Sequence, residues 1–382
     1  MVRAGGIVDS PMRTKVLIVG GFPHEDSKVY GGVVTVCKEL TQSKFSSEFD
    51  LELVDSTQRS NPPPGLAVRS AWAVIRCFRF TIKLISCRPA VVVLFVATGG
   101  SVLEKGLMSA LGTLAGSKVM VFPRGAELIE QALSSKSNFL WIGACLKAAD
   151  YLLCQGESWH RFAVQRLGFE ASKAPIIHNW TANPEMLNSG KRRQQRSPGE
   201  STRILFIGWV EKEKGIKELI EAVRILSANL ELDLTIAGHG NYYESAKRKV
   251  MDYDLNSRVH FTGWVDSRRR TELLMNTDIF VLPSWAEGFP NSVIEAMAAK
   301  TAVVVSSVGI IPDILKNEVD AVLVEPKNSY QLAAAMRKLI EDEALRNQIA
   351  HRGYITAVSA FNKEKNIEKL SSIIRSAASR TG

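Results

Sequence analysis

The sequence predicts an α/β protein of two domains, each built on a parallel β-sheet that helices cover on both faces. Short apolar, β-branched runs alternate with helix-like segments along the 382 residues. Apolar runs between helices are typical of strands buried on both faces of a parallel sheet. A polar, basic segment that is poor in periodic hydrophobes divides the chain near its middle, which indicates a linker between two domains.

The strands can be placed one by one. In the N-terminal half we expect them at residues 15–21, 50–55, 91–97, 118–123, 150–155 and 174–179. In the C-terminal half we expect them at residues 203–209, 232–238, 259–264, 278–284, 302–307 and 321–325. The domain boundaries are then 1–182 for the first domain, 183–202 for the linker, 203–360 for the second domain and 361–382 for a C-terminal helix that packs back on the first domain. Both domains are Rossmann-like, so ligands should bind at the carboxyl ends of the strands, in a cleft between the two sheets.

The composition is ordinary for a globular protein, with 46% hydrophobic and 23% charged residues. Five scattered cysteines without a CxxC pair indicate neither a disulfide framework nor a zinc site, and favour a reducing compartment. No apolar run approaches the roughly 18 residues that span a bilayer, and the first residues lack the pattern of a signal peptide. We therefore expect a cytoplasmic protein.

The formal net charge of +9 makes nucleic acid a candidate partner. The sequence has no aromatic-basic RNA motif, zinc finger or recognition helix, so we expect no nucleic-acid binding. Much of the positive charge of the N-terminal half instead lies in a window without any acidic residue, between Asp55 and Glu104.

Residues 66–88 in this window suit an amphipathic helix. At 100° per residue one side carries Ala71, Val74, Ile75, Phe78, Ile82 and Ile85. Arg69, Arg76, Arg79 and Lys83 cluster within about 80° on the other side. The common arrangement would bury the apolar side in the domain and leave the basic side solvated. A basic face also suits anionic lipid headgroups or a lipid-diphosphate acceptor, which would place the protein on the inner face of the cytoplasmic membrane.

Two glycine turns follow strands of the C-terminal half. Gly208 ends the first strand, and the loop GWVEKEKG then leads into a helix. Lys214 lies just before that helix, where it could meet an anion near the positive helix end, although a surface lysine would give the same pattern. Gly238 lies in the Gly-x-Gly turn of TIAGHG. The third glycine of a dinucleotide fingerprint is absent, so this turn indicates only a close approach of the backbone.

The segment SWAEGFPNSVIEAMAAK carries two glutamates, Glu287 and Glu295. A helix should begin near Asn291 or Ser292, and Ser292-x-x-Glu295 fits a capping box, which would explain Glu295 without any ligand. Glu287 lies outside the helix, beside Gly288, where capping gives no reason for a glutamate. Free N–H groups in the first helical turn would favour a phosphate.

These pieces together resemble the nucleotide-sugar-binding half of a family 4 retaining glycosyltransferase (glycosyl transferases group 1), which has the GT-B fold. The matching stretches are FIGWVEKEKG, TIAGHG, VHFTGWV, the Glu287–Glu295 pair and GIIPDIL, and their order and spacing match across residues 203–326. The resemblance implies that Glu287 contacts the donor sugar at the reacting carbon, that Glu295 holds the ribose hydroxyls and that Lys214 grips the diphosphate. One departure is Trp209, which stands where the family usually has a second phosphate-binding arginine. Lys212 is a candidate to compensate for it.

The N-terminal half contributes fewer candidates. Gly31 and Gly32 follow the first strand, where the family has a glycine-rich loop near the donor phosphate and the acceptor, although a tight turn would need glycine too. Arg124 ends the strand VFP, at a place where the family often has a histidine near the reacting sugar. An arginine cannot act as a base there but can stabilise negative charge, unless a neighbouring carboxylate holds it. We interpret His178 and Asn179 as structural.

The predicted catalytic residues are thus Glu287, Lys214 and Arg124. The predicted donor-binding residues are Gly31, Gly32, Gly208, Lys212, Gly238, Gly288, Phe289, Asn291, Ser292 and Glu295. The resemblance implies a nucleotide-diphospho-sugar donor and a glycan acceptor, lipid-linked in bacterial surface polysaccharide synthesis. No cofactor or catalytic metal is expected, because the Asp252–Asp254 pair lies away from the cleft. The alternatives are a sugar-nucleotide epimerase of the same fold and a nucleotide-sugar-binding protein without turnover.

Overall fold

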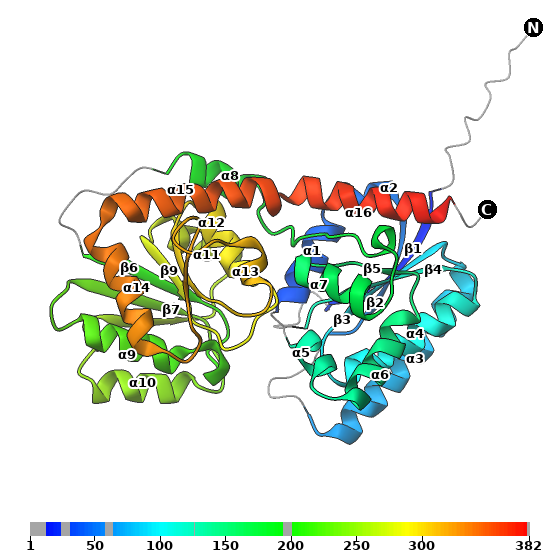
Figure 1. Ribbon diagram of the computed structural model, residues 1–382, viewed down its shortest axis with the longest axis horizontal. Helices are drawn as coiled ribbons and strands as arrows, with labels where there is room; N and C mark the ends of the chain where they lie inside the picture. Colours follow the sequence, from blue (N-terminus) through cyan, green and yellow to red (C-terminus); the bar gives the residue numbers. More distant parts are fainter. Residues whose placement is uncertain (1–12, 24–30, 58–63, 126, 194–200, 380–382) are drawn as a thin grey trace, which may run out of the picture.

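The computed structural model describes residues 13–23, 31–57, 64–125, 127–193 and 201–379. Figure 1 shows two α/β domains side by side, with one long helical segment crossing both of them. Within the described ranges, every helix is too short or too polar to cross a bilayer.

The N-terminal domain contains a five-stranded parallel sheet in the order β2-β1-β3-β4-β5. Its strands are β1 (Lys15–Gly20), β2 (Asp50–Asp55), β3 (Val91–Val96), β4 (Lys118–Pro123) and β5 (Tyr151–Leu152). The strand expected at residues 174–179 is wrong, because this segment makes only an isolated bridge between Ile176 and Cys154. The β-branched central strand β3 is buried along its whole length, as its apolar sequence predicts.

Helices cover both faces of this sheet. They are α1 (Gly32–Thr41), α2 (Phe45–Glu48), α3 (Leu66–Cys87), α4 (Gly100–Leu114), α5 (Leu128–Leu133), α6 (Lys136–Lys147) and α7 (Glu157–Arg161). Side chains of β1 alternate between the two faces: Val16 and Ile18 pack with α1 and α2, whereas Leu17 and Val19 pack with α3 and α4.

The C-terminal domain contains a six-stranded parallel sheet in the order β11-β10-β9-β6-β7-β8. Its strands are β6 (Thr202–Ile207), β7 (Leu232–Ala237), β8 (Val259–Gly263), β9 (Ile279–Leu282), β10 (Ala302–Ser306) and β11 (Val322–Val324). Its helices are α9 (Ile216–Leu226), α10 (Tyr243–Asp252), α11 (Ser267–Met275), α12 (Asn291–Ala298), α13 (Ile311–Ile314), α14 (Ser329–Glu341) and α15 (Glu343–Ala360). All six strands expected here are present.

The chain passes between the domains twice. Part of the segment expected as a linker forms helix α8 (Pro184–Lys191), which packs on α12 of the C-terminal domain. The last helix, α16 (Lys363–Ala378), returns to the N-terminal domain and buries Ile367, Leu370 and Ile374 on the same sheet face as α1. The two passages lie together, because the backbone N–H of Lys363 donates to the carbonyl oxygen of Ala182 at 3.2 Å.

Candidate active site

The candidate site lies where the carboxyl ends of the two sheets meet. Loops after β1 and β4 contribute Gly32 and Arg124 from the N-terminal domain, and the loop after β9 contributes Gly288 from the C-terminal domain. A Cβ atom on Gly288 would lie 3.6 Å from the carbonyl oxygen of Arg124 and 3.6 Å from the side chain of Gln155. The structure therefore brings predicted residues of both domains together, at the place where parallel α/β sheets bind ligands.

Lys214 and Glu287 form the most direct pair in the site. The Nζ atom of Lys214 donates to Glu287 Oε1 at 2.5 Å, and the hydroxyl of the buried Ser284 donates to the same oxygen at 2.8 Å. Lys214 ends the short 3-10 turn Lys212–Lys214 after β6. Gly215 follows it with φ +70°, and a Cβ there would overlap the carbonyl oxygen of Pro283. Only glycine fits this position. Because Gly215 lies so close to the β9 loop, the neighbouring Lys214 reaches Glu287 in that loop.

Glu295 is not part of a capping box, so that interpretation is wrong. Helix α12 begins at Asn291 with Pro290 as its N-cap, and no side chain caps it. Ser292 is therefore already inside the helix, two residues beyond the N-cap position that a capping box requires. The Glu295 carboxylate instead accepts hydrogen bonds from Arg270 Nη1, at 3.2 Å to each oxygen.

Burial governs the protonation of Glu295, which is only 5% exposed. Desolvation raises the pKa of this carboxyl above its ordinary value, and the Arg270 guanidinium opposes that rise. A buried carboxylate with a single cationic partner has further acceptor capacity for hydroxyl groups. This environment suits the predicted contact with ribose better than a helix cap would.

The side chains of Asn179 and Asn291 join the two domains at the start of α12. Asn291 Nδ2 donates to the carbonyl oxygen of Gly32 at 3.1 Å, and Asn291 Oδ1 accepts from Asn179 Nδ2 at 3.1 Å. Asn179 Nδ2 also donates to the carbonyl oxygen of Phe289 at 2.9 Å. Our interpretation of Asn179 as structural did not foresee that its contacts bridge the two domains. Its position after the last apolar run of the domain was the available signal.

A second contact between the domains lies at α7 and α13. Asp313 Oδ2 accepts from the backbone N–H of Ser158 at 2.7 Å, and Asp313 Oδ1 accepts from the Ser158 hydroxyl at 2.7 Å. Ser158 lies in the first turn of α7, where unsatisfied N–H groups favour a carboxylate. Sequence reasoning did not assign Asp313 any role, because its partner comes from the other domain.

Arg124 lies at the end of β4 with its guanidinium 5.0 Å from the centre of the Phe122 ring. Its Nη1 atom is buried and has no hydrogen-bond partner among the described residues. Burial lowers the pKa of Arg124 to about 10. The alternative of an arginine held by a neighbouring carboxylate is thus not met within the described ranges. A half-buried guanidinium with a buried Nη1 atom and no carboxylate partner among the described residues favours an anionic ligand.

The predicted glycines differ in what they require. Gly31 has an extended φ of 170°, which any residue adopts, and no atom of the described residues lies within 4 Å of a Cβ built on it. The tight-turn interpretation therefore fails for Gly31, and none of the described residues fills the space beside it. Gly238 has φ +145°, and a Cβ there would overlap the carbonyl oxygen of Gly208. The close approach of two strand ends explains this glycine without a ligand.

Aromatic contacts involve three residues that the sequence singled out: Trp209, Lys212 and Phe289. Trp209 packs edge-on against Trp264, with 4.6 Å between ring centres. The Nζ atom of Lys212 lies 5.7 Å from the ring centre of Trp285, so this cation already rests on an aromatic face. The Phe289 side chain, predicted to contact the donor, is 5% exposed and packs on Phe361 at 4.5 Å. The ring belongs to the core, and a contact of Phe289 with the donor stays a prediction.

Comparison with known proteins supports the expected family. Residues 189–356 match the family model described as glycosyl transferases group 1. An uncharacterized glycosyltransferase of Methanocaldococcus jannaschii is 32% identical, over 47% of this chain and 48% of that protein. A putative teichuronic acid biosynthesis glycosyltransferase of Bacillus subtilis is 26% identical, over 68% of this chain and 62% of that protein. An N,N'-diacetylbacillosaminyl-diphospho-undecaprenol alpha-1,3-N-acetylgalactosaminyltransferase of Campylobacter jejuni is 33% identical, over 43% of this chain and 41% of that protein. The chain thus spans about half the length of these curated relatives.

Solved structures show the fold over nearly the whole chain. Sucrose-phosphate synthase from Thermosynechococcus elongatus superposes with a TM-score of 0.76 at 17% identity, covering 95% of this chain and 99% of that one. Anabaena HepE in complex with UDP superposes with a TM-score of 0.70 at 15% identity, covering 96% and 100%. The protein has the GT-B fold, and its residues 189–356 match the family model of the glycosyl transferases group 1.

Proposed function

We propose that the protein is a retaining glycosyltransferase that moves a sugar from a nucleotide-diphospho-sugar to a glycan acceptor. The observation that carries this proposal is the Lys214–Glu287 pair, which lies at the carboxyl ends of β6 and β9, next to the start of α12. A cation, a carboxylate and free helical N–H groups at one point are what a sugar diphosphate requires.

In this proposal the donor lies across the C-terminal domain. Glu295 accepts hydrogen bonds from the ribose hydroxyls, while Arg270 donates to the same carboxyl group. The first turn of α12 and Lys214 bind the diphosphate. When the diphosphate attracts Lys214, Glu287 Oε1 keeps its hydrogen bond from Ser284. Glu287 then holds the hydroxyls of the donor sugar close to the reacting carbon.

The difficult step is the departure of the nucleoside diphosphate while positive charge grows at the anomeric carbon. Lys214 and the N-terminus of α12 stabilise the negative charge that develops on the leaving group. Arg124 adds a cation from the opposite domain, which offsets the absence of an arginine at position 209. The acceptor hydroxyl attacks from the face that the diphosphate leaves, so the configuration is retained. These protein groups supply the positive charge, so the step as proposed needs no metal ion or cofactor.

The acceptor is proposed to be a lipid-linked glycan of bacterial surface polysaccharide synthesis, used in the cytoplasm at the inner face of the membrane. Support comes from relatives whose names specify teichuronic acid biosynthesis and a diphospho-undecaprenol acceptor. A relative described as a lipopolysaccharide core biosynthesis glycosyltransferase of Rhizobium meliloti is 26% identical over 50% of this chain.

The test is incubation of the protein with a panel of nucleotide sugars, with and without a lipid extract that contains glycan acceptors. Transfer of label to lipid supports the proposal. Interconversion of nucleotide sugars without an acceptor would show an epimerase, and binding without a product would show a non-catalytic binding protein. Glu287→Gln should lower transfer by at least about a hundredfold while the melting temperature stays near that of the wild type. Full activity of this variant would remove Glu287 from the mechanism.

A further inference from the structure

Helix α3 presents its apolar side to solvent, which is the reverse of the expected orientation. Phe80 and Leu84 face the sheet and are buried. Five apolar side chains on the opposite side are between 48% and 69% exposed: Val74, Ile75, Phe78, Ile82 and Ile85. The expectation that this side packs into the domain is therefore wrong.

Neighbouring helices extend the apolar surface. Helix α3 packs on α4, and α4 packs on α6, and Figure 1 shows the three together at the outer end of the N-terminal domain. On α4 and α6 the exposed apolar side chains are Leu103, Leu107, Leu114 and Leu140. We call the five α3 residues and these four leucines the outer apolar face. Large exposed apolar patches of this kind mark interaction surfaces.

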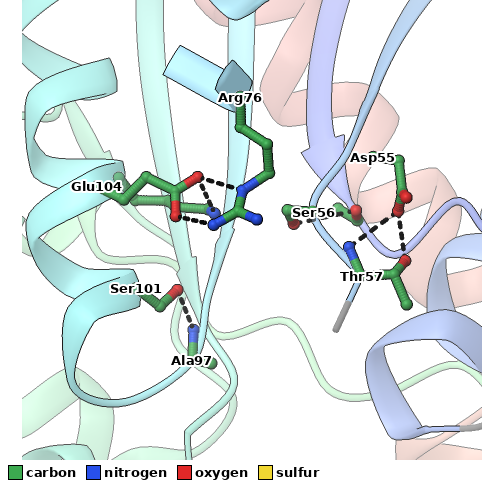
Figure 2. A network of polar contacts seen from close by, with 9 residues as sticks. Asp55, Ser56, Thr57, Arg76, Ala97, Ser101 and Glu104 are labelled. Atoms are coloured by element: carbon green, nitrogen blue, oxygen red, sulfur yellow. Dashed lines mark hydrogen bonds and ion pairs between the residues drawn. The ribbon is translucent and has the colours of Figure 1, made fainter. Parts of the chain in front are cut away.

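A buried ion cluster holds α3 in this orientation. Arg76 donates from Nε and Nη2 to the two oxygens of Glu104, at 2.8 and 2.7 Å, and Lys105 Nζ donates to Glu104 at 3.1 Å. Figure 2 shows Arg76 reaching from α3 to Glu104 on α4. A rotation that buried the apolar side would separate Arg76 from Glu104 and leave a buried charge without a partner. Lys83 is held in a similar way by Glu52 at 2.7 Å.

These ion pairs also correct the predicted membrane contacts. Arg76 is engaged inside the domain, and Lys83 pairs with Glu52 at the surface, whereas Arg69 and Arg79 are exposed, as is Arg88 just after α3. Helices α3 and α4 carry a single acidic residue between them, Glu104, which is buried. The outer apolar face is therefore bordered by cations without exposed carboxylates on these two helices.

This charge distribution distinguishes between possible occupants. A second copy of the chain, related by a two-fold axis, would place the same arginines close to one another across the contact, and like charges at an interface are costly. An anionic surface would pair with the arginines while it accepts the apolar side chains.

We propose that the outer apolar face docks onto the surface of an anionic lipid bilayer. Val74, Phe78 and Ile82 enter the boundary between headgroups and acyl chains, and the exposed Arg79, at the edge of the apolar side, lies at the lipid phosphates. The interaction deepens the proposed function, on which the lipid-linked acceptor rests, because it holds the N-terminal domain at the membrane. Binding to vesicles nevertheless requires no sugar transfer, so the two proposals can fail separately.

The experiment is sedimentation of the full chain with vesicles of phosphatidylcholine alone or of phosphatidylcholine mixed with phosphatidylglycerol. A face variant carries Val74→Ser, Phe78→Ser and Ile82→Ser. We expect its partition onto the mixed vesicles to fall by at least about a hundredfold, because three exposed apolar side chains no longer enter the bilayer. The change Arg79→Gln should lower binding to the mixed vesicles by roughly fivefold and binding to phosphatidylcholine far less.

The matched control replaces three exposed apolar residues of the C-terminal domain, Met251→Ser, Tyr330→Ser and Ile355→Ser, which are 65%, 76% and 44% exposed. This variant should bind vesicles like the wild type. The proposal is overturned if the wild type binds neither vesicle, if the face variant binds as well as the wild type, or if the wild type self-associates through the face instead. If the face variant still transfers sugar to a soluble acceptor, the proposed function stands whether or not the protein binds vesicles.

Discussion

The Arg270–Glu295 pair allows the sharpest test of the site's electrostatics. Arg270 Nη1 is the side-chain partner found for the Glu295 carboxylate within the described residues, and the side chains of Arg270 and Glu295 are 27% and 7% exposed. Arg270→Leu removes the cation and leaves a buried carboxylate. Breaking a buried pair on one side costs about 3–5 kcal/mol, and the partial exposure of Arg270 favours the lower end, about 3 kcal/mol.

The loss of stability in Arg270→Leu should depend on pH, and the direction follows from the pKa of Glu295. Burial already raises the pKa of Glu295 above its ordinary value of 4.5, and loss of Arg270 removes the main opposing influence. The folded variant then binds a proton more tightly than the unfolded chain, so its free energy of unfolding falls as pH rises above that ordinary value. The destabilisation by Arg270→Leu should be small at about pH 5 and near its full size at about pH 7.5.

Urea unfolding of the full chain, followed by tryptophan fluorescence at both pH values, measures this effect. The double variant Arg270→Leu, Glu295→Leu is the control, because it removes both charges and should recover most of the lost stability. An equal loss for Arg270→Leu at the two pH values, or no recovery in the double variant, would refute the reasoning.

Two further predictions concern backbone geometry and domain contact. Gly215→Ala should lower the free energy of unfolding by about 1–3 kcal/mol, because its φ of +70° and the carbonyl of Pro283 exclude a Cβ. Thermal unfolding measures this loss, and the control Gly100→Ala, where none of the described residues lies within 4 Å of the added Cβ, should cost nothing. Asp313→Ala removes two hydrogen bonds from Ser158, each worth about 1.5–3 kcal/mol. The domains should then separate more easily, which increases the radius of gyration measured by solution scattering. An unchanged scattering curve would show that the domains stay together without this contact.

The sequence predicted the strands well where their side chains alone decide the structure. The apolar runs of β3 and β9 have few alternatives to burial in a parallel sheet, so composition and length are sufficient. The proximity of Lys214 and Glu287 could be predicted, because both residues follow strands of one parallel sheet. The segment at residues 174–179 has the same apolar character but gains only a bridge to Cys154, because the sheet ends at the two-residue β5.

The orientation of α3 shows where a sequence argument stops. Helical periodicity separates an apolar side from a basic side but does not say which of them meets the domain. That outcome depends on Glu104, a residue of another helix, whose buried carboxylate binds Arg76. The bridge from Asn179 to Asn291 was missed for a related reason, since its two ends are 112 residues apart and belong to different domains.

The two chain passages at Ala182 and Lys363 have a mechanical consequence. Because they are hydrogen-bonded to each other, we expect the two domains to rotate about this point, which acts as a hinge, when they open. Phe361 lies at this hinge and touches the ring of Phe289 in the β9–α12 loop. Rotation of the domains would therefore strain this aromatic contact, and mutations at Phe361 should alter the rate of opening although this residue lies outside the predicted sugar site.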